Sequence, residues 1–154
     1  MTDEIIVFLA SFLIWVMFAG LVILWFVDGR IKKEQVLHAL LASFMAWTIA
    51  EVMKQIFHTP RPFQLDGLPI MTLTKPLDPA FPSGHAATVF ALAVTIWFHD
   101  RKVGIIFVIF AALVAWARVA ANVHYPIDVI VGGLIGTIVA IAVEKNHLKF
   151  GRKE

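Results

Sequence analysis

The sequence predicts an all-α integral membrane protein, a helical bundle with about five transmembrane helices, and three observations support this. First, 60% of the 154 residues are hydrophobic, only 16% are charged and the mean hydropathy is +0.83, which is too apolar for an ordinary soluble domain. Second, a formal net charge of only +2 excludes a disordered chain and gives no sign of a nucleic-acid partner. Third, the apolar residues fall into five runs of about the length that crosses a bilayer.

The expected spans are, in order, residues 5–27, 36–57, 83–98, 103–123 and 126–143. The first run has 23 residues without a charge, and about 20 suffice to cross about 30 Å of hydrocarbon. Because Asp3 and Glu4 precede it and no small-residue cleavage pattern follows, we expect a retained span rather than a signal peptide. The second run contains Glu51 and Lys54, and ionisable residues within a span are functional candidates.

The third run has only 16 residues, and the fifth begins at Pro126, where a helix tolerates proline. The connection over residues 58–81 carries five of the seven prolines, so we expect an ordered, extended segment rather than a helix. The sequence contains no repeat, linker or soluble domain. Residues 1–154 are therefore interpreted as a single transmembrane domain.

Five spans place the two termini on opposite sides of the membrane, so the basic residues of the connections form two sets. The larger set has nine members: Arg30, Lys32, Lys33, Arg101, Lys102, Lys145, Lys149, Arg152 and Lys153. The smaller set has the remaining four: Lys54, Arg61, Lys75 and Arg118. Because Lys and Arg are enriched in cytoplasmic loops, we expect the larger set to be cytoplasmic. The N-terminus and residues 58–81 then face the extracytoplasmic side of the cell membrane.

Three short motifs fall on this predicted extracytoplasmic face. They are Lys54 followed by Arg61-Pro62, then Pro82-Ser83-Gly84-His85, and then Arg118, His124 and Asp128. Hydrolysis of a phosphate ester depends mainly on positioning and on stabilising the charge of the phosphoryl oxygens. Lys54, Arg61 and Arg118 supply positive charge. Ser83 and Gly84 begin the third helix, where free backbone N–H groups favour an anion. The pattern therefore predicts a phosphate-binding site.

His124 and Asp128 are four residues apart, and the helix begins near Pro126, so the carboxylate lies close to the imidazole. A carboxylate that holds one ring nitrogen fixes the tautomer and leaves the other nitrogen free to attack. The basic residues take the place of Mg²⁺, and Asp66, Asp78 and Asp128 are too widely spaced to suggest a metal cluster. The sequence has no cysteine, which excludes a thiolate zinc site or a cysteine nucleophile. We expect no metal and no other cofactor.

These motifs, in this order, resemble the type 2 phosphatidic acid phosphatase family, which includes integral membrane lipid phosphatases and soluble vanadium haloperoxidases. The resemblance covers residues 54–128 as motifs and, through the helix pattern, most of the chain. It implies that His124 attacks phosphorus to form a phosphohistidine and that Asp128 orients this histidine. It also implies that His85 protonates the leaving oxygen and then activates water for the second half-reaction.

Two features depart from the family pattern. The third motif usually begins Ser-Arg, and here Ala117 precedes Arg118, which removes a hydroxyl that could brace the phosphate. Many membrane members of the family also have one more span than the five expected here. We expect activity to tolerate Ala117, because Arg118, His124 and Asp128 are all present.

Other polar residues have simpler interpretations. Lys54 on its own could extend to the membrane interface, and Glu51, one turn earlier, is more simply an ion-pair partner of Lys54 than a catalyst. His38 and His58 lie near span ends and are interpreted as interfacial or packed histidines. The Gly-x-x-x-Gly spacing at residues 132–136 is more typical of close packing within a bundle than of a dimer contact. The oligomeric state stays open.

The leading hypothesis is a metal-independent lipid phosphatase in the cell membrane, acting on a membrane lipid phosphate at a site on the extracytoplasmic side. Resemblance to small bacterial polyprenyl-diphosphate phosphatases favours hydrolysis of undecaprenyl diphosphate to undecaprenyl phosphate, in recycling of the cell-wall carrier lipid. Phosphatidylglycerophosphate, phosphatidic acid and the 1-phosphate of lipid A stay open as substrates. A small anion transporter could also bury charged residues, but it explains neither the spacing of His124 and Asp128 nor the Pro-Ser-Gly-His helix start.

Overall fold

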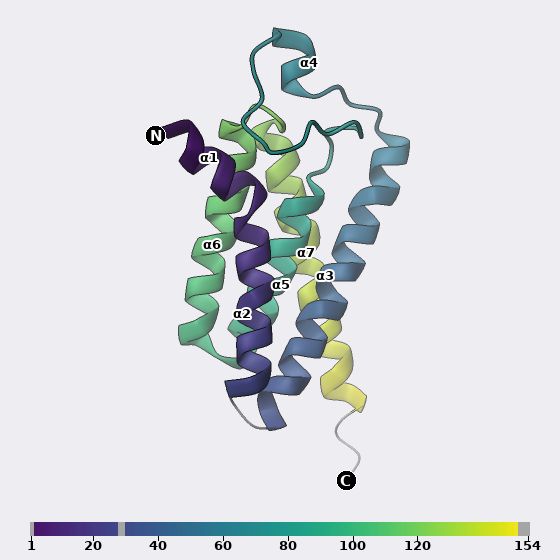
Figure 1. Cartoon of the computed structure of the whole chain (residues 1–154). Helices are drawn as coiled ribbons and strands as arrows, with labels where there is room; N and C mark the ends of the chain where they lie inside the picture. The colour runs from purple at the N-terminus through teal and green to yellow at the C-terminus, as the bar shows by residue number, and fades with distance from the viewer. Residues whose placement is uncertain (1, 28–29, 151–154) are drawn as a thin grey trace.

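The structure, a computed structural model, describes residues 2–27 and 30–150, with side chains at residues 3–26 and 33–146. That part of the chain forms seven α-helices and no strand. The helices are α1 (Thr2–Ser11), α2 (Leu13–Val27), α3 (Arg30–Ile56), α4 (Pro62–Asp66), α5 (Gly84–His99), α6 (Arg101–Ala120) and α7 (Pro126–Phe150). The five longest helices run lengthwise through one bundle, and α4 lies across one end of it (Figure 1).

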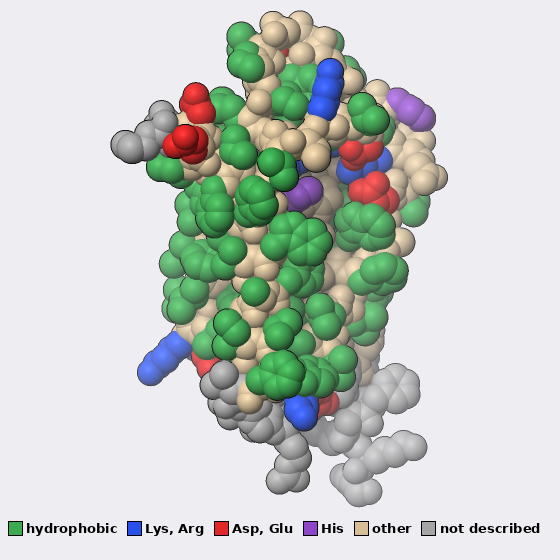
Figure 2. All heavy atoms as spheres, viewed as in Figure 1, with side chains coloured by type: hydrophobic (Ala, Val, Ile, Leu, Met, Phe, Trp, Pro, Cys, Tyr) green, Lys and Arg blue, Asp and Glu red, His purple; other side chains and the backbone are tan. Residues whose placement is uncertain are grey.

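Three helical segments are long and apolar enough to cross a membrane: Lys33–Ile56, Arg101–Ala120 and Pro126–Asn146. Helices α1 and α2 together would make a fourth span, bent by 49° at their junction. Helix α5 is apolar but shorter, with 16 residues. Figure 2 shows hydrophobic side chains over the middle of the molecule and charged side chains towards its two ends, as a bilayer requires. The chain is an all-α, multi-pass membrane protein, as predicted.

The span expected over residues 5–27 is not one continuous helix, because the helix breaks at Phe12. Next to the break, the carbonyl oxygen of Ala10 accepts a hydrogen bond of 3.1 Å from Nη1 of Arg118. A side chain that inserts into the helical hydrogen-bond ladder is an established cause of a kink. Helix α1 therefore lies obliquely across the end of the bundle, while α2 runs along it (Figure 1).

Residues 58–81 are expected from the sequence to form an extended segment rather than a helix. This is wrong for Pro62–Asp66, which form the five-residue helix α4. Pro62 is its first residue, and Gly67 ends it with a φ of 69°, which a glycine adopts without strain. The segment is ordered, as expected, by hydrogen bonds that include Met71 N–H to the carbonyl of Ala121 at 3.1 Å. These contacts hold residues 58–81 over the ends of the other helices.

Helix α5 is the centre of the bundle and packs against α3, α6 and α7. Ten of its 16 residues are buried. A Cβ added at Gly132 would lie 2.4 Å from the carbonyl oxygen of Ser83, and one added at Gly136 would lie 2.2 Å from that of Ala87. Helices α5 and α7 therefore touch backbone to backbone, which confirms the interpretation of the Gly-x-x-x-Gly spacing as close packing within the bundle. This contact places the start of α7 beside the start of α5.

The two ends of the bundle differ in charge. Helices α3 and α6 begin, and α7 ends, at the end away from α4 (Figure 1). Basic residues of the larger set at this end include Lys33, Arg101, Lys102 and Lys145, whereas Arg152 and Lys153 lie outside the described residues. Lys54, Arg61 and Arg118 lie at the end that carries α4.

Replacing Gly136 with alanine is expected to destabilise the fold, because the new Cβ would lie 2.2 Å from the oxygen of Ala87 and 2.8 Å from the nitrogen of Ala91. Overpacking of this kind costs roughly 1–3 kcal/mol. Gly133→Ala is the matched control, since it gains the same helix propensity but its Cβ meets only the movable ring of Phe90, at 3.2 Å. Thermal unfolding in detergent should show a clearly lower midpoint for Gly136→Ala, and equal midpoints would contradict the packing argument.

Candidate active site

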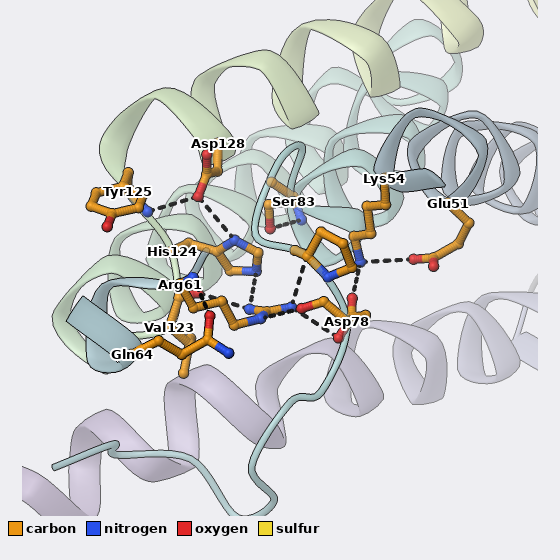
Figure 3. Close-up of polar contacts among 12 residues, drawn as sticks. Glu51, Lys54, Arg61, Gln64, Asp78, Ser83, Val123, His124, Tyr125 and Asp128 are labelled. Carbon is orange, nitrogen blue, oxygen red and sulfur yellow. Dashed lines mark hydrogen bonds and ion pairs between the residues drawn. The ribbon is translucent and has the colours of Figure 1, made fainter. Parts of the chain in front are cut away.

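A cavity of about 430 Å³ lies at the end of the bundle that carries α4. Its walls come from helices α1, α2, α3, α5 and α6, from the segments on both sides of α4, and from the connection before α7. Segments far apart in sequence therefore meet there. The ionisable side chains that line it are Glu51, Lys54, Arg61, Asp78, His85, Arg118 and His124. Figure 3 shows how closely several of these side chains converge.

The N-terminus of α5 borders this cavity. Ser83 is the N-cap residue: its Oγ accepts a hydrogen bond from Ala86 N–H at 3.4 Å, and its own N–H donates to the carbonyl of Asp128 at 3.0 Å. Gly84 begins the helix and lines the cavity. A Cβ at Gly84 would lie 3.2 Å from Oε1 of Glu51, so a larger residue here would require the Glu51 side chain to shift. The arrangement leaves free N–H groups of the first turn beside the cavity, where they can bind an anion.

Arg61 is only 2% exposed, although it lies in a connection just before α4. Its Nε donates to the carbonyl of Asp78 at 2.8 Å, and its Nη2 donates to Oδ1 of Asp78 at 3.0 Å. Its Nη1 donates to the carbonyl of Val123 at 2.7 Å and lies 3.3 Å from Nε2 of His124. The guanidinium therefore links the connection before α5 to the connection before α7 and helps to position His124 (Figure 3).

Lys54, in the last turn of α3, donates to Oε1 of Glu51 at 2.9 Å and forms an ion pair with Asp78. This confirms the interpretation of Glu51 as an ion-pair partner. Asp78 lies between Lys54 and Arg61 and contacts both. Burial raises the pKa of Asp78, but the hydrogen bond from Lys54 and the charges of Lys54 and Arg61 outweigh this effect, so the pKa falls below its ordinary value. Asp78 is therefore ionised at neutral pH and neutralises part of the positive charge.

His124 and Asp128 are almost completely buried, at 2% and 1% exposed. Nδ1 of His124 lies 3.4 Å from Oδ2 of Asp128, which also accepts a 2.8 Å hydrogen bond from Tyr125 N–H. The other ring nitrogen, Nε2, lies beside Arg61 at the cavity. Burial lowers the pKa of His124, the hydrogen bond with Asp128 opposes this, and the charges of Arg118 and Arg61 lower the pKa further. The ring is therefore neutral at neutral pH, with Nδ1 beside Asp128 and Nε2 within hydrogen-bond distance of Arg61.

Arg118 lies near the end of α6 and is 6% exposed. It lines the cavity and also holds the carbonyl of Ala10 at the kink between α1 and α2. Ala117, which stands where the family motif has serine, is fully buried in an apolar cluster with Phe63 and Val123. An apolar side chain suits these surroundings, because a hydroxyl buried there needs a hydrogen-bond partner.

The structure brings the eight predicted site residues together. Six of them line the cavity: Lys54, Arg61, Gly84, His85, Arg118 and His124. Ser83 and Asp128 are buried directly behind it, bonded to each other through the backbone. Asp78, expected from the sequence only as one of several widely spaced acids, lies in the site between Lys54 and Arg61. One feature of the sequence could have indicated Asp78: three cationic residues in one buried site require a carboxylate nearby to compensate their charge.

A second cavity, of about 500 Å³, adjoins the first between α2, α3 and α5. The two share Trp15, Trp47, Gly84 and His85 in their walls, so they are contiguous. The other residues of the second cavity are Ile14, Phe18, Leu40, Ser43, Phe44 and Thr88. We call it the apolar cleft. Phe44 is 64% exposed on the outer surface of the bundle, so the cleft leads from the cationic cavity to the apolar surface.

Both acidic residues of the cavity are paired with cationic side chains, Glu51 with Lys54 and Asp78 with Lys54 and Arg61. Among the described side chains, a group with metal-ligating chemistry lies elsewhere: His38, His99 and Glu144. These residues belong to α3, α5 and α7 and lie at the opposite end of the bundle.

The chain belongs to the PAP2 superfamily, whose family model matches residues 35–152. It is 27% identical over 143 residues to bacitracin transport permease protein BcrC of Bacillus licheniformis, over 93% of this chain and 70% of that protein. It is 28% identical over 137 residues to undecaprenyl-diphosphatase BcrC of Bacillus subtilis (strain 168), over 89% of this chain and 70% of that protein.

The fold is also that of a solved relative. The crystal structure of Aquifex aeolicus LpxE matches with a TM-score of 0.75 and 30% sequence identity, over 94% of this chain and 84% of that one. The prediction from the three motifs is therefore confirmed at the level of the family and of the enzyme class: the chain is a lipid phosphatase of the PAP2 superfamily.

Replacing Asp78 with asparagine should strengthen the binding of a phosphate-like anion, because the amide keeps an oxygen acceptor for Arg61 but removes the competing charge. For this half-exposed carboxylate we expect roughly 1 kcal/mol, or about fivefold tighter inhibition by vanadate. The inhibition constant for vanadate can be measured on any phosphate ester that the enzyme cleaves. Asp66→Asn is the control, because Asp66 is exposed and does not line the cavity. Unchanged or weaker inhibition in Asp78→Asn would contradict the competition.

Proposed function

We propose that this chain is a metal-independent lipid phosphatase that hydrolyses undecaprenyl diphosphate to undecaprenyl phosphate through a phosphohistidine. The observation that carries the proposal is that the cationic cavity, with its two histidines, is contiguous with the apolar cleft. The two share four residues in their walls. Such a site accepts a charged phosphate headgroup and a hydrocarbon tail together, with the tail on the membrane side.

In the first half-reaction, Lys54, Arg61 and Arg118 bind the phosphoryl oxygens, together with N–H groups at the start of α5. Asp128 holds Nδ1 of His124, so Nε2 attacks phosphorus. A P–N bond forms, and the bond from phosphorus to the leaving oxygen breaks. His85, which lines both the cavity and the cleft, donates a proton to that oxygen, and the lipid product leaves along the cleft.

In the second half-reaction, neutral His85 takes a proton from a water molecule, whose oxygen attacks the phosphohistidine. The P–N bond breaks, inorganic phosphate forms, and His124 returns to its neutral state. The burial of His124 supports this role, because a neutral imidazole is the nucleophilic form. A proton on Nδ1, held by Asp128, lets the imidazole leave phosphorus as a neutral group.

The choice of lipid rests on relatives and on the shape of the site. A relative that is 28% identical carries the name undecaprenyl-diphosphatase. The apolar cleft has no charged residue in its walls, so it suits a long isoprenoid tail and offers little to recognise a large polar headgroup. Phosphatidylglycerophosphate, phosphatidic acid and lipid A 1-phosphate contain the same reacting group and are the alternative substrates to be compared.

Phosphate release in detergent should persist in excess EDTA, because the cationic side chains supply the charge that a metal supplies elsewhere. Undecaprenyl diphosphate should be cleaved faster than the three alternative lipids and faster than farnesyl diphosphate, whose tail fills less of the apolar cleft. His124→Ala should reduce release by about 1000-fold or more, because it removes the nucleophile. His58→Ala is the control, because His58 is exposed and does not line the cavity.

Each outcome of this assay separates one alternative. Loss of activity in EDTA, at a temperature at which circular dichroism shows that the protein stays folded, would contradict metal-independent catalysis. Full activity in His124→Ala would contradict the phosphohistidine. Faster cleavage of another lipid would replace undecaprenyl diphosphate as the substrate. No release from any of these lipids by the folded protein would mean that the motifs are retained without this activity, or that Ala117 impairs it.

The active site is further proposed to face the extracytoplasmic side of the cell membrane, because the basic residues gather at the opposite end of the bundle. The chain has no cysteine, so a single introduced thiol reports its own location. Leu77→Cys, at a residue that is 89% exposed near the cavity, should react with a membrane-impermeant maleimide in intact cells. Lys102→Cys, exposed at the other end, should react only after the membrane is permeabilised. The reverse labelling pattern would overturn this orientation.

A further inference from the structure

Three helices bring metal-ligating side chains together at the end of the bundle opposite the active site. His38 lies in α3, His99 is the last residue of α5 and Glu144 lies in α7. Nε2 of His99 lies 3.0 Å from Oε1 of Glu144, and Nδ1 of His38 lies 3.4 Å from the same oxygen. One ligand atom from each residue can be chosen so that all three lie within 4.8 Å of one another. We call these residues the His–His–Glu cluster.

The carboxylate of Glu144 is buried, at 10% side-chain exposure, and its contacts in the cluster are two imidazoles. An ionised carboxylate that leaves water requires compensating positive charge. A divalent cation bound by the three side chains would supply such charge. The charge of the cluster therefore favours a bound cation.

We propose that the His–His–Glu cluster is a zinc-binding site. Two imidazole nitrogens and one carboxylate oxygen form a ligand set that zinc takes in proteins. Tetrahedral bonds of about 2.0–2.1 Å place neighbouring ligand atoms about 3.3 Å apart, close to the 3.0 Å and 3.4 Å separations found here. The side chain of His99 is 23% exposed, so a water molecule or a further ligand can reach the fourth position.

The cluster is too far from the active site for its metal to take part in catalysis. Helix α5 has 16 residues, so His99 and Gly84 are separated by about 22 Å at 1.5 Å per residue. The role of the bound metal follows instead from the three helices that the cluster joins. Helices α3, α5 and α7 carry Lys54, Gly84 and Asp128 at their other ends. A metal bond to all three helices fixes their relative positions along the bundle and so stabilises the arrangement of the active site. This inference does not depend on the proposed substrate.

Metal binding can be measured on the full-length protein, purified in detergent without a polyhistidine tag, stripped with EDTA and dialysed. Competition with a chromophoric zinc chelator should give one tight site per chain, and Co²⁺ should give the visible absorption of a tetrahedral complex. Removing one of three protein ligands should weaken zinc binding by about 100-fold or more in His99→Ala and in Glu144→Gln. His58→Ala, which removes an exposed histidine at the other end, should bind zinc like the wild type.

Zinc should also raise the thermal unfolding midpoint of the wild type and of His58→Ala but not that of Glu144→Gln, because a ligand that binds the folded state stabilises it. Glu144→Gln preserves shape, and circular dichroism with phosphate release will establish that it folds. If it does not fold, His38→Gln takes its place. Three results would each overturn the proposal. The cluster variants could bind zinc with wild-type affinity, His124→Ala could lose zinc binding, or the wild type could bind less than about one-tenth of a zinc ion per chain.

Discussion

The constraint on which the structure depends is the burial of three cationic side chains beside a membrane. Lys54, Arg61 and Arg118 are each 6% exposed or less and line one cavity. Buried charges of one sign repel and lose their hydration, so each requires compensation. The chain supplies it with Glu51, with Asp78 and with backbone carbonyls from segments that lie far apart in sequence. Much of the irregular structure of the chain exists because it brings these oxygens to the cations.

Arg118 illustrates how one such requirement shapes the backbone. Its side chain extends from α6 and donates a hydrogen bond to the carbonyl of Ala10, next to the break between α1 and α2. The break turns Ser11 and Phe12 into the wall of the cavity. Arg61 acts in the same way on the connections, since its guanidinium joins Asp78 to Val123. The two arginines proposed to bind the phosphate are therefore already held in place by oxygens of the protein, which preorganises the site.

Much of this could be predicted from the sequence, because apolar length and motif spacing are local properties. The all-α membrane class follows from hydropathy, and the start of α5 follows from Pro-Ser-Gly-His, with Ser83 as its cap. The break at Phe12 could not be predicted, because the sequence has no proline or glycine there and the cause is an arginine 106 residues away. The pairing of Asp78 with Lys54 and Arg61 could not be predicted either, because it depends on how residues 58–81 fold back over these two side chains. His38, interpreted as interfacial or packed, gains its partners from two other helices.

The same three helices thus carry charged groups at both ends, and the spacing between those ends is set by close backbone packing. Gly132 and Gly136 let α7 touch α5, and this contact allows the N–H of Ser83 to bond the carbonyl of Asp128. A shift of α7 along α5 by one residue, about 1.5 Å, would break that bond and separate Asp128 from the anion-binding start of α5. Small residues at the helix contact therefore set the geometry of the proposed site, because a phosphoryl group must be held at distances that only a rigid bundle preserves.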